Sequence, residues 1–225
     1  MNKSIEGLLL INKSKKSTSF SLVRLLRKVT KVQKIGHAGT LDPFAQGLMI
    51  MLIGKTYTKK SNLFLSQDKE YDAILHLGYI TESFDPETPL QHCNDIIPTI
   101  EEVQHALKEL SGEVLQIPPM YSAKKINGQK LYQLARQGKT VERAPVKVKI
   151  TINLTNYNYP FLSLKVSCSK GTYIRSLAND IGEKLGCGAY LKELIRTRSG
   201  SFALQDSIEE DNITSIESIS NHLIL

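Results

Sequence analysis

The sequence Gly36-His37-Ala38-Gly39-Thr40-Leu41-Asp42-Pro43-Phe44-Ala45-Gln46-Gly47 follows an amphipathic segment and leads into an apolar one that ends at Ile53. The glycines permit a positive φ and the close approach of another backbone segment. Pro43 disfavours the α conformation at the preceding residue, Asp42. These properties predict a loop that presents the Asp42 carboxylate at its end, where it can reach a substrate.

The Asp42-Pro43 pair also has a structural interpretation. Aspartate is a preferred helix N-cap and proline is favoured in the first helical turn, so the pair can simply start a helix. His37 and the Lys13 to Lys16 segment indicate, on their own, only ordinary surface positions.

The segments around this loop alternate between strand and helix patterns. On its amino-terminal side, Gly7–Asn12 predicts a buried strand and Ser19–Val29 an amphipathic helix. On its carboxy-terminal side, Lys55–Ser66 predicts a second helix and Glu70–Gly78 a strand. The first third of the chain therefore contains both helix and strand patterns.

The remainder of the chain continues the same mixture. Thr99 and Glu102 have the spacing of a helix capping box, and Asn127-Gly128 is typical of a hairpin turn. Leu131–Arg136 predicts a short helix, and Val146–Leu154 and Leu162–Cys168 predict two paired strands. Thr172–Leu185 predicts a helix, Leu191–Leu204 a strand, and the last twenty residues a polar terminal helix. With no internal repeat or clear linker, we expect a single mixed α/β domain over residues 1–225.

Charge is distributed unevenly along the chain, whose net charge is +7. Residues 1–60 carry 12 Lys+Arg against 2 Asp+Glu, and residues 121–150 carry 8 against 1. Residues 61–120 are acidic, with 2 against 11. Basic segments separated by an acidic one are typical of a surface that binds a phosphate backbone, although a solvated face has the same composition.

Composition argues against several classes of protein. The short apolar run Gly7–Ile11 is too brief for a signal peptide core, and no stretch is long enough to span a membrane, so we expect a cytoplasmic protein. The 3 cysteines form no Cys-x-x-Cys pair and the 5 histidines are scattered, so neither a disulfide framework nor a metal site is expected.

Six ordered blocks of the sequence resemble the TruB family of bacterial tRNA pseudouridine synthases. The loop quoted above is similar to the family signature Gly-His-x-Gly-Thr-Leu-Asp-Pro. The other blocks are Leu8-Leu-Leu-Ile-Asn-Lys13, Asp68-Lys-Glu-Tyr71, Ile117-Pro-Pro-Met-Tyr-Ser-Ala-Lys-Lys125, Cys168-Ser-Lys-Gly-Thr-Tyr-Ile-Arg175 and Gly186-Cys-Gly-Ala189. They extend from about residue 5 to residue 205.

This resemblance implies a fold and a reaction. The fold is the mixed α/β pseudouridine synthase fold, a central mostly antiparallel sheet flanked by helices, with a basic arm near residues 118–146. The reaction is isomerisation of the uridine at tRNA position 55, in the T loop, without cofactor or metal. The implied partner is the T arm of tRNA, and a monomer is expected. Longer relatives carry a carboxy-terminal PUA domain, which we do not expect here.

The resemblance also implies roles for individual residues. Asp42 matches the catalytic aspartate, Arg175 the arginine that pairs with it, and Tyr71 the tyrosine that stacks on the flipped base. His37 matches the histidine that fills the space left by the extruded nucleotide. Residues of the uracil pocket are matched by Tyr173 and Leu194, and RNA-backbone contacts in the arm by Lys124, Lys125, Lys130, Arg136 and Lys139.

Some of these positions have simpler interpretations, and some blocks depart from the family pattern. Arg175 has the pattern of a surface arginine on a helix, and Leu194 that of a core leucine. Ser14 replaces a common proline, Thr81-Glu-Ser-Phe-Asp85 is looser than the family's Thr-Asp-Thr-x-Asp, and Ile195 precedes Arg196 where two arginines are common.

Other functions and several chemical routes remain open from sequence alone. Attack at the uracil C6 carbon, attack at the anomeric carbon and a glycal route would all use Asp42. A non-catalytic RNA-binding or RNA-folding factor would retain the basic segments. A small-substrate α/β enzyme that binds phosphate would depend on Gly36, Gly39 and the lysine-rich amino-terminal region.

Overall fold

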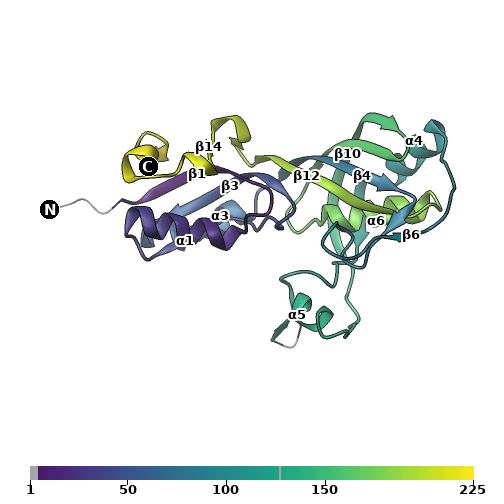
Figure 1. The fold of residues 1–225 in the computed structure, drawn as a ribbon, viewed down its shortest axis with the longest axis horizontal. Helices are drawn as coiled ribbons and strands as arrows, with labels where there is room; N and C mark the ends of the chain where they lie inside the picture. The colour runs from purple at the N-terminus through teal and green to yellow at the C-terminus, as the bar shows by residue number, and fades with distance from the viewer. Residues whose placement is uncertain (1–4, 127) are drawn as a thin grey trace. The chain divides into compact units, whose positions relative to one another are not determined.

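The computed structural model describes residues 5–126 and 128–225, which form two compact units (Figure 1). Unit 1 comprises Met1–Asp72 and Leu194–Leu225, and unit 2 comprises Ala73–Glu193. Two long strands, β4 (Lys69–Leu77) and β12 (Ala189–Ser199), contribute residues to both units. Each unit is described by itself.

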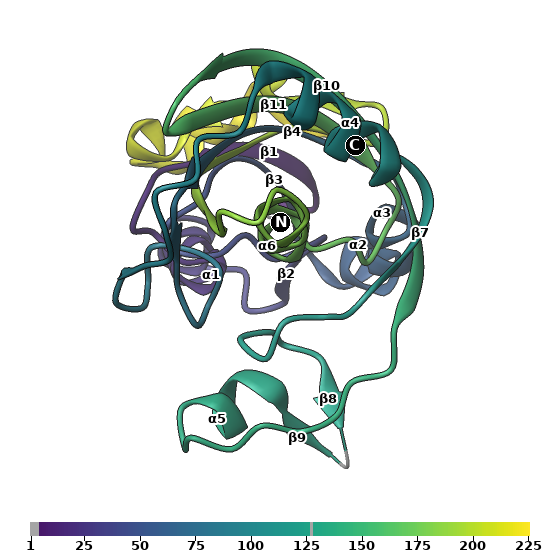
Figure 2. The same cartoon turned by 90° about the vertical axis from the view of Figure 1, so that its right-hand side faces the viewer.

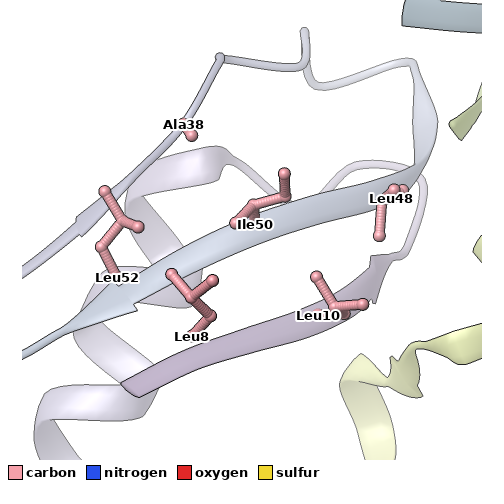
Figure 3. Close-up of a cluster of buried hydrophobic side chains, with 6 residues drawn as sticks. All are labelled: Leu8, Leu10, Ala38, Leu48, Ile50 and Leu52. Atoms are coloured by element: carbon pink, nitrogen blue, oxygen red, sulfur yellow. The ribbon is translucent and has the colours of Figure 1, made fainter. Parts of the chain in front are cut away.

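Unit 1 is built on two antiparallel strands, β1 (Gly7–Lys13) and β3 (Gln46–Ile53), which pair from Gly7↔Ile53 to Lys13↔Gly47. The short strand β2 (Ile35–His37) pairs with β3 on its other edge. Every residue from Gly47 to Ile53 is buried, since both faces of this strand are covered. One face packs the apolar cluster Leu8, Leu10, Ala38, Leu48, Ile50 and Leu52 (Figure 3).

The helices of unit 1 partly match their predictions. Helix α1 (Ser19–Thr30) is confirmed and begins with a capping box at Thr18. The single helix predicted over Lys55–Ser66 is wrong, because two short helices, α2 (Lys55–Lys59) and α3 (Ser61–Leu65), occupy it. The break arises at Lys60, whose N–H bonds to the carbonyl of Tyr57 three residues back and tightens the turn.

The carboxy-terminal part of unit 1 mostly extends the sheet. The predicted terminal helix is largely wrong: only α7 (Ile216–Ser220) is helical, after two short 3₁₀ turns, η1 (Leu204–Asp206) and η2 (Glu210–Asn212). Strands β14 (Ile208–Glu209) and β15 (Leu223–Ile224) both pair with β1, and β13 (Phe202–Ala203) pairs with β12. The apolar residues Leu223 and Ile224 pair with β1 in the sheet, whereas a solvent-exposed terminal helix would leave them without such partners.

Unit 2 is a sheet with the strand order β12-β4-β11-β10-β7. The predicted strand pair is confirmed as β10 (Val146–Asn158) and β11 (Phe161–Cys168), and β7 (Gly112–Gln116) extends it. Helix α6 (Ile174–Lys184) lies on one face of this sheet (Figure 2), and α4 (Ile100–Glu109) has the predicted capping box at Thr99. Beyond β4 the chain forms the small pair β5 (Tyr79–Ile80) and β6 (Gln91–His92).

The basic arm predicted near residues 118–146 belongs to unit 2. It contains the hairpin β8 (Lys125–Ile126) and β9 (Gln129–Lys130), then helix α5 (Leu131–Ala135). These elements lie together, apart from the sheet of their own unit (Figure 2). The hairpin and the short helix are confirmed, whereas Asn127 lies outside the described residues.

The predicted fold class is confirmed: helices flank a mixed sheet in which most pairings are antiparallel. Parallel pairs join β1 to β14 and β3 to β12. Within the described residues, no helix combines the length and the apolar character needed to cross a membrane.

Candidate active site

The loop that carries Asp42 lies between β2 and β3 of unit 1, and its first half is held from two sides. The Ala38 N–H donates to the Ile50 carbonyl at 2.9 Å, and Gly39 takes a positive φ of 97°. The Ser19 hydroxyl, at the start of α1, accepts from the Leu41 N–H and donates to the Leu41 carbonyl, both at 3.1 Å. The backbone immediately before Asp42 is therefore fixed.

Asp42 itself begins a turn. Its carbonyl accepts from the Ala45 N–H at 3.1 Å, with Pro43 and Phe44 at the centre, and β3 follows directly at Gln46. The helix-cap interpretation of Asp42-Pro43 is therefore wrong, because a strand and not a helix follows the pair. The Asp42 side chain is half-buried, at the end of the loop, as the glycine and proline pattern predicts.

Arg196, on β12, braces the loop from a third side. Its guanidinium donates to the carbonyls of Leu48 at 2.7 Å and Gly39 at 3.2 Å, and the residue is only 2% exposed. Gly47 lies against the Arg196 backbone with a φ of 109°, and a Cβ there would come within 2.5 Å of the Arg196 carbonyl oxygen. Sequence reasoning noted Arg196 only as a departure from a double-arginine pattern and did not assign it this role.

His37 lies at the end of β2, on the same loop. Burial and, to a lesser extent, the nearby Arg196 charge lower its pKa from the ordinary value of 6.5. Its Nδ1 atom is buried and accepts or donates no hydrogen bond within the described part of the chain. Burial and an Nδ1 atom with no hydrogen-bond partner among the described residues are consistent with the space-filling role predicted for His37, which stays a prediction.

Tyr71 and Leu194 are the other two predicted site residues of unit 1. Tyr71 is in the alternating strand β4 and Leu194 in β12, and they are 9% and 5% exposed. Both residues are therefore buried. Burial is compatible with a pocket wall and with plain core packing, so their roles stay predictions.

Arg175, in the first turn of α6, is buried in unit 2 at 4% exposure. Its NH1 lies 3.1 Å from Asp85 Oδ2 and donates to the Ser83 carbonyl, and its NH2 donates to the Tyr121 carbonyl at 2.8 Å. The interpretation of Arg175 as a surface arginine is therefore wrong. Asp42 and Arg175 belong to different units, so their predicted pairing stays a prediction.

Asp85 is a buried charge that sequence reasoning did not assign to the site. It is 1% exposed, and its Oδ1 accepts from the Ser83 hydroxyl at 2.6 Å and from the Glu87 N–H at 2.9 Å. The Thr81 hydroxyl donates to the Asp85 carbonyl at 2.8 Å. The Thr-x-Ser-x-Asp spacing, noted only as a loose family block, was the available signal.

Tyr173, the residue before α6, is anchored by its backbone. Its N–H donates to Gln116 Oε1 at 2.8 Å and its carbonyl accepts from Gln116 Nε2 at 3.0 Å. This pair of bonds uses the whole amide of Gln116, which is 3% exposed on β7. Tyr173 is half-buried, so part of the residue is accessible to a ligand. Its predicted role in the uracil pocket stays a prediction.

The basic residues predicted to contact RNA are all in the arm of unit 2. Lys125, Arg136 and Lys139 are exposed, whereas Lys124 and Lys130 are half-buried. Lys130 and Arg136 both lie over the Tyr132 ring, at 5.5 and 5.4 Å from its centroid. The arm therefore presents cations together with an aromatic ring, a combination suited to nucleic acid.

Comparison with protein families covers almost the whole chain. Residues 27–174 match the model of the TruB family pseudouridylate synthase N-terminal domain, and residues 175–223 that of the tRNA pseudouridylate synthase B C-terminal domain. The chain belongs to the TruB family. The resemblance inferred from the sequence blocks is thus confirmed.

Two similar proteins agree with this placement. The tRNA pseudouridine synthase B of Protochlamydia amoebophila (strain UWE25) is 54% identical over 220 residues, 98% of this chain and 84% of that protein. The protein of the same name from Clostridium tetani (strain Massachusetts / E88) is 43% identical over 222 residues, 98% of this chain and 76% of that protein.

Solved structures support the TruB fold. A crystal structure of a Cbf5-Nop10-Gar1 complex contains a chain with a TM-score of 0.72 and 28% identity, matched over 92% of this chain. An H/ACA RNP bound to a substrate RNA containing 2'-deoxyuridine gives a TM-score of 0.68 and 26% identity over 92% of this chain. The chain spans about half the length of these two matched chains, 53% and 51%.

Proposed function

We propose that this protein isomerises uridine to pseudouridine at position 55 in the T loop of tRNA, with Asp42 as nucleophile. We further propose that it acts as a cytoplasmic monomer, without cofactor or metal. The tRNA pseudouridine synthase B relatives, 54% and 43% identical, support the reaction and the substrate class. The observation that carries the proposal is the placement of Asp42 at the end of a loop whose backbone is fixed on three sides.

Such a loop suits a nucleophile. Ser19, Lys16 and Arg196 bond to the backbone at Leu41, Pro43 and Gly39, so the Asp42 backbone is fixed while its carboxylate stays half-exposed. A fixed carboxylate can meet the substrate with little reorganisation, which contributes strongly to catalysis.

The proposed reaction breaks one bond and forms another within the same nucleotide. The bond from uracil N1 to the ribose anomeric carbon breaks, uracil rotates, and its C5 carbon bonds to the anomeric carbon. The C5 hydrogen leaves as a proton and N1 gains a proton, so no oxidant or cofactor is required. A carboxylate can stabilise or bond to an electron-poor anomeric carbon, as in retaining glycosidases. Attack at C6 and a glycal route use the same Asp42.

The other predicted residues receive supporting roles. The target base must leave the stacked T loop, which costs a few kcal/mol. Stacking of the base on Tyr71 would offset about 1 to 3 kcal/mol of that cost. Removal of the C5 proton is a second proposed role for Tyr71. We propose that Tyr173 and Leu194 line the uracil pocket, that His37 fills the space left by the nucleotide, and that the Arg175 charge favours ionised Asp42.

A tritium-release assay tests this proposal. T-arm RNA labelled at uridine C5 is incubated with the protein in the absence of added metal, and release of tritium reports formation of the new C5 bond. Asp42→Asn should abolish release and retain RNA binding. Asp206→Asn, the same change at an exposed aspartate, is the matched control and should leave release unchanged.

Two results would contradict the proposal. Tritium release by Asp42→Asn would exclude Asp42 as the nucleophile. No release by the wild type at enzyme excess, together with equal acceleration of tRNA refolding by wild type and Asp42→Asn, would favour a non-catalytic RNA-folding factor.

A further inference from the structure

The segment between β1 and α1 forms a turn held in a sparsely populated conformation. The Ser17 N–H donates to the Ser14 carbonyl at 3.3 Å, and Lys16, at the third position of this turn, has a φ of 69°. Residues with a side chain rarely adopt a positive φ, and they keep it only where surrounding contacts impose it. The turn Ser14–Ser17 should therefore depend on contacts from outside.

Glu210 supplies such contacts from the opposite end of the chain. Its Oε2 accepts from the Ser14 N–H at 2.9 Å and its Oε1 accepts from the Ser17 hydroxyl at 2.6 Å. One carboxylate thus holds both ends of the turn. The register of the β1–β14 pair, Asn12↔Glu209, brings Glu210 beside this turn.

Lys13 holds the same turn from inside the fold. Its Nζ donates to the Ser14 carbonyl at 3.0 Å and to the Ser17 carbonyl at 2.7 Å, and the residue is 0% exposed. The expectation that Lys13 is an ordinary surface residue is therefore wrong. Glu210 therefore fixes the turn at the Ser14 N–H and the Ser17 hydroxyl, and Lys13 fixes it at the Ser14 and Ser17 carbonyls.

The tip of this turn contacts the Asp42 loop. The Lys16 N–H donates to the Pro43 carbonyl at 2.8 Å, and Pro43 is the second residue of the turn that begins at Asp42. If the φ of Lys16 became negative, its N–H would no longer point at this carbonyl. The two turns are consequently coupled through a single backbone hydrogen bond.

We propose that Glu210 is a positioning residue of the active site, which acts through the Ser14–Ser17 turn to fix the backbone beside Asp42. This inference rests on the proposed function for its effect on rate, but the coupling of the turns can be measured without substrate. Among the side-chain hydrogen bonds of the described residues, those of the Glu210 carboxylate go to Ser14 and Ser17 and none goes to Asp42. Glu210 acts on the chemical step and not on RNA affinity.

The neighbouring Glu209 provides a matched control. Its carboxylate accepts from Asn12 Nδ2 at 2.9 and 3.1 Å, so it also joins the carboxy-terminal segment to β1. It makes no contact with the Ser14–Ser17 turn among the hydrogen bonds of the described residues. A general loosening of the carboxy-terminal segment would affect both variants, whereas loss of positioning would affect only Glu210→Ala.

The first measurement is the single-turnover rate constant with T-arm RNA at saturating enzyme, together with the Kd for that RNA. We expect Glu210→Ala to slow the rate about 10- to 100-fold, since small misplacements of a reacting group have effects of this size. Its Kd should be unchanged, and Glu209→Ala should match the wild type. Glu210→Gln should be intermediate, because its amide offers one acceptor oxygen where the carboxylate offers two.

The second measurement is hydrogen exchange at the Lys16 amide by NMR, which needs no RNA. Protection should fall in Glu210→Ala and persist in Glu209→Ala. Retained protection in Glu210→Ala, equal slowing in both alanine variants, or weaker RNA binding at an unchanged rate would each overturn the positioning role. An inactive wild type would instead overturn the proposed function, and Lys16 exchange would still decide whether Glu210 holds the turn.

Discussion

Arg175 and Asp85 form a buried ion pair, with 3.1 Å between NH1 and Oδ2 and side-chain exposures of 5% and 2%. Ser83 and Glu87 supply further hydrogen bonds to the Asp85 carboxylate, and the carbonyls of Ser83 and Tyr121 accept from Arg175. Buried charges persist only when they are paired and well hydrogen-bonded. The Thr81–Asp85 loop and the start of α6 are therefore joined through charge.

Replacing Asp85 by asparagine should destabilise the protein by about 3 kcal/mol, because the buried Arg175 charge loses this carboxylate. Urea denaturation of the wild type and Asp85→Asn measures the difference. Glu82→Gln is the control from the same loop, since its contact with the Tyr121 hydroxyl is exposed and should contribute less than about 1 kcal/mol. Equal stability of Asp85→Asn and the wild type would show that the pair makes no net contribution.

Binding of T-arm RNA should depend on the charge of the arm. Lys125→Ala and Lys139→Ala each remove an exposed cation, and each should reduce the slope of log Kd against log salt by about 1. Fluorescence anisotropy across a salt series gives these slopes. Lys108→Ala, at an exposed position of α4, should leave the slope unchanged, and an equal effect there would indicate non-specific attraction.

Local patterns predicted local structure. Thr99 and Glu102 lie three residues apart and formed the expected capping box, and alternation along β11 gave its buried face of Leu162, Leu164 and Val166. The same logic placed Asp42 at the end of a loop, because glycine and proline constrain the backbone where they stand. It could not exclude a helix N-cap at Asp42, because an Asp-Pro pair can begin either a helix or a turn.

The missed residues act over long separations. Arg196 bonds to Leu48 across 148 positions, and Glu210 bonds to Ser14 across 196. Such contacts depend on which strands become neighbours, here β12 beside β3 and β14 beside β1. No periodicity in one sequence encodes that choice. Residues matched only by family resemblance, such as Tyr71 and Leu194, are placed by the structure but not tested by it.

Asp180, on α6, should make stability depend on pH. Burial raises the pKa of its carboxyl to about 6, with a smaller contribution from the Glu183 charge, in a hollow lined also by Leu110, Leu115 and Ile117. The folded protein then binds more protons than the unfolded chain between pH 3.8 and about 6. The free energy of unfolding must therefore fall as pH rises through this window.

Asp180→Asn should remove this dependence because it leaves a neutral side chain of the same shape. We expect the variant to be more stable than the wild type at pH 7.5, by about 1 kcal/mol once screening of the partly exposed group is included. The difference should disappear near pH 3, below both pKa values, where the carboxyl is protonated in the folded state and largely so in the unfolded chain. Urea denaturation at both pH values measures it, and Glu183→Gln should produce a smaller gain in the same direction. A constant difference at both pH values would exclude titration of Asp180 as the cause.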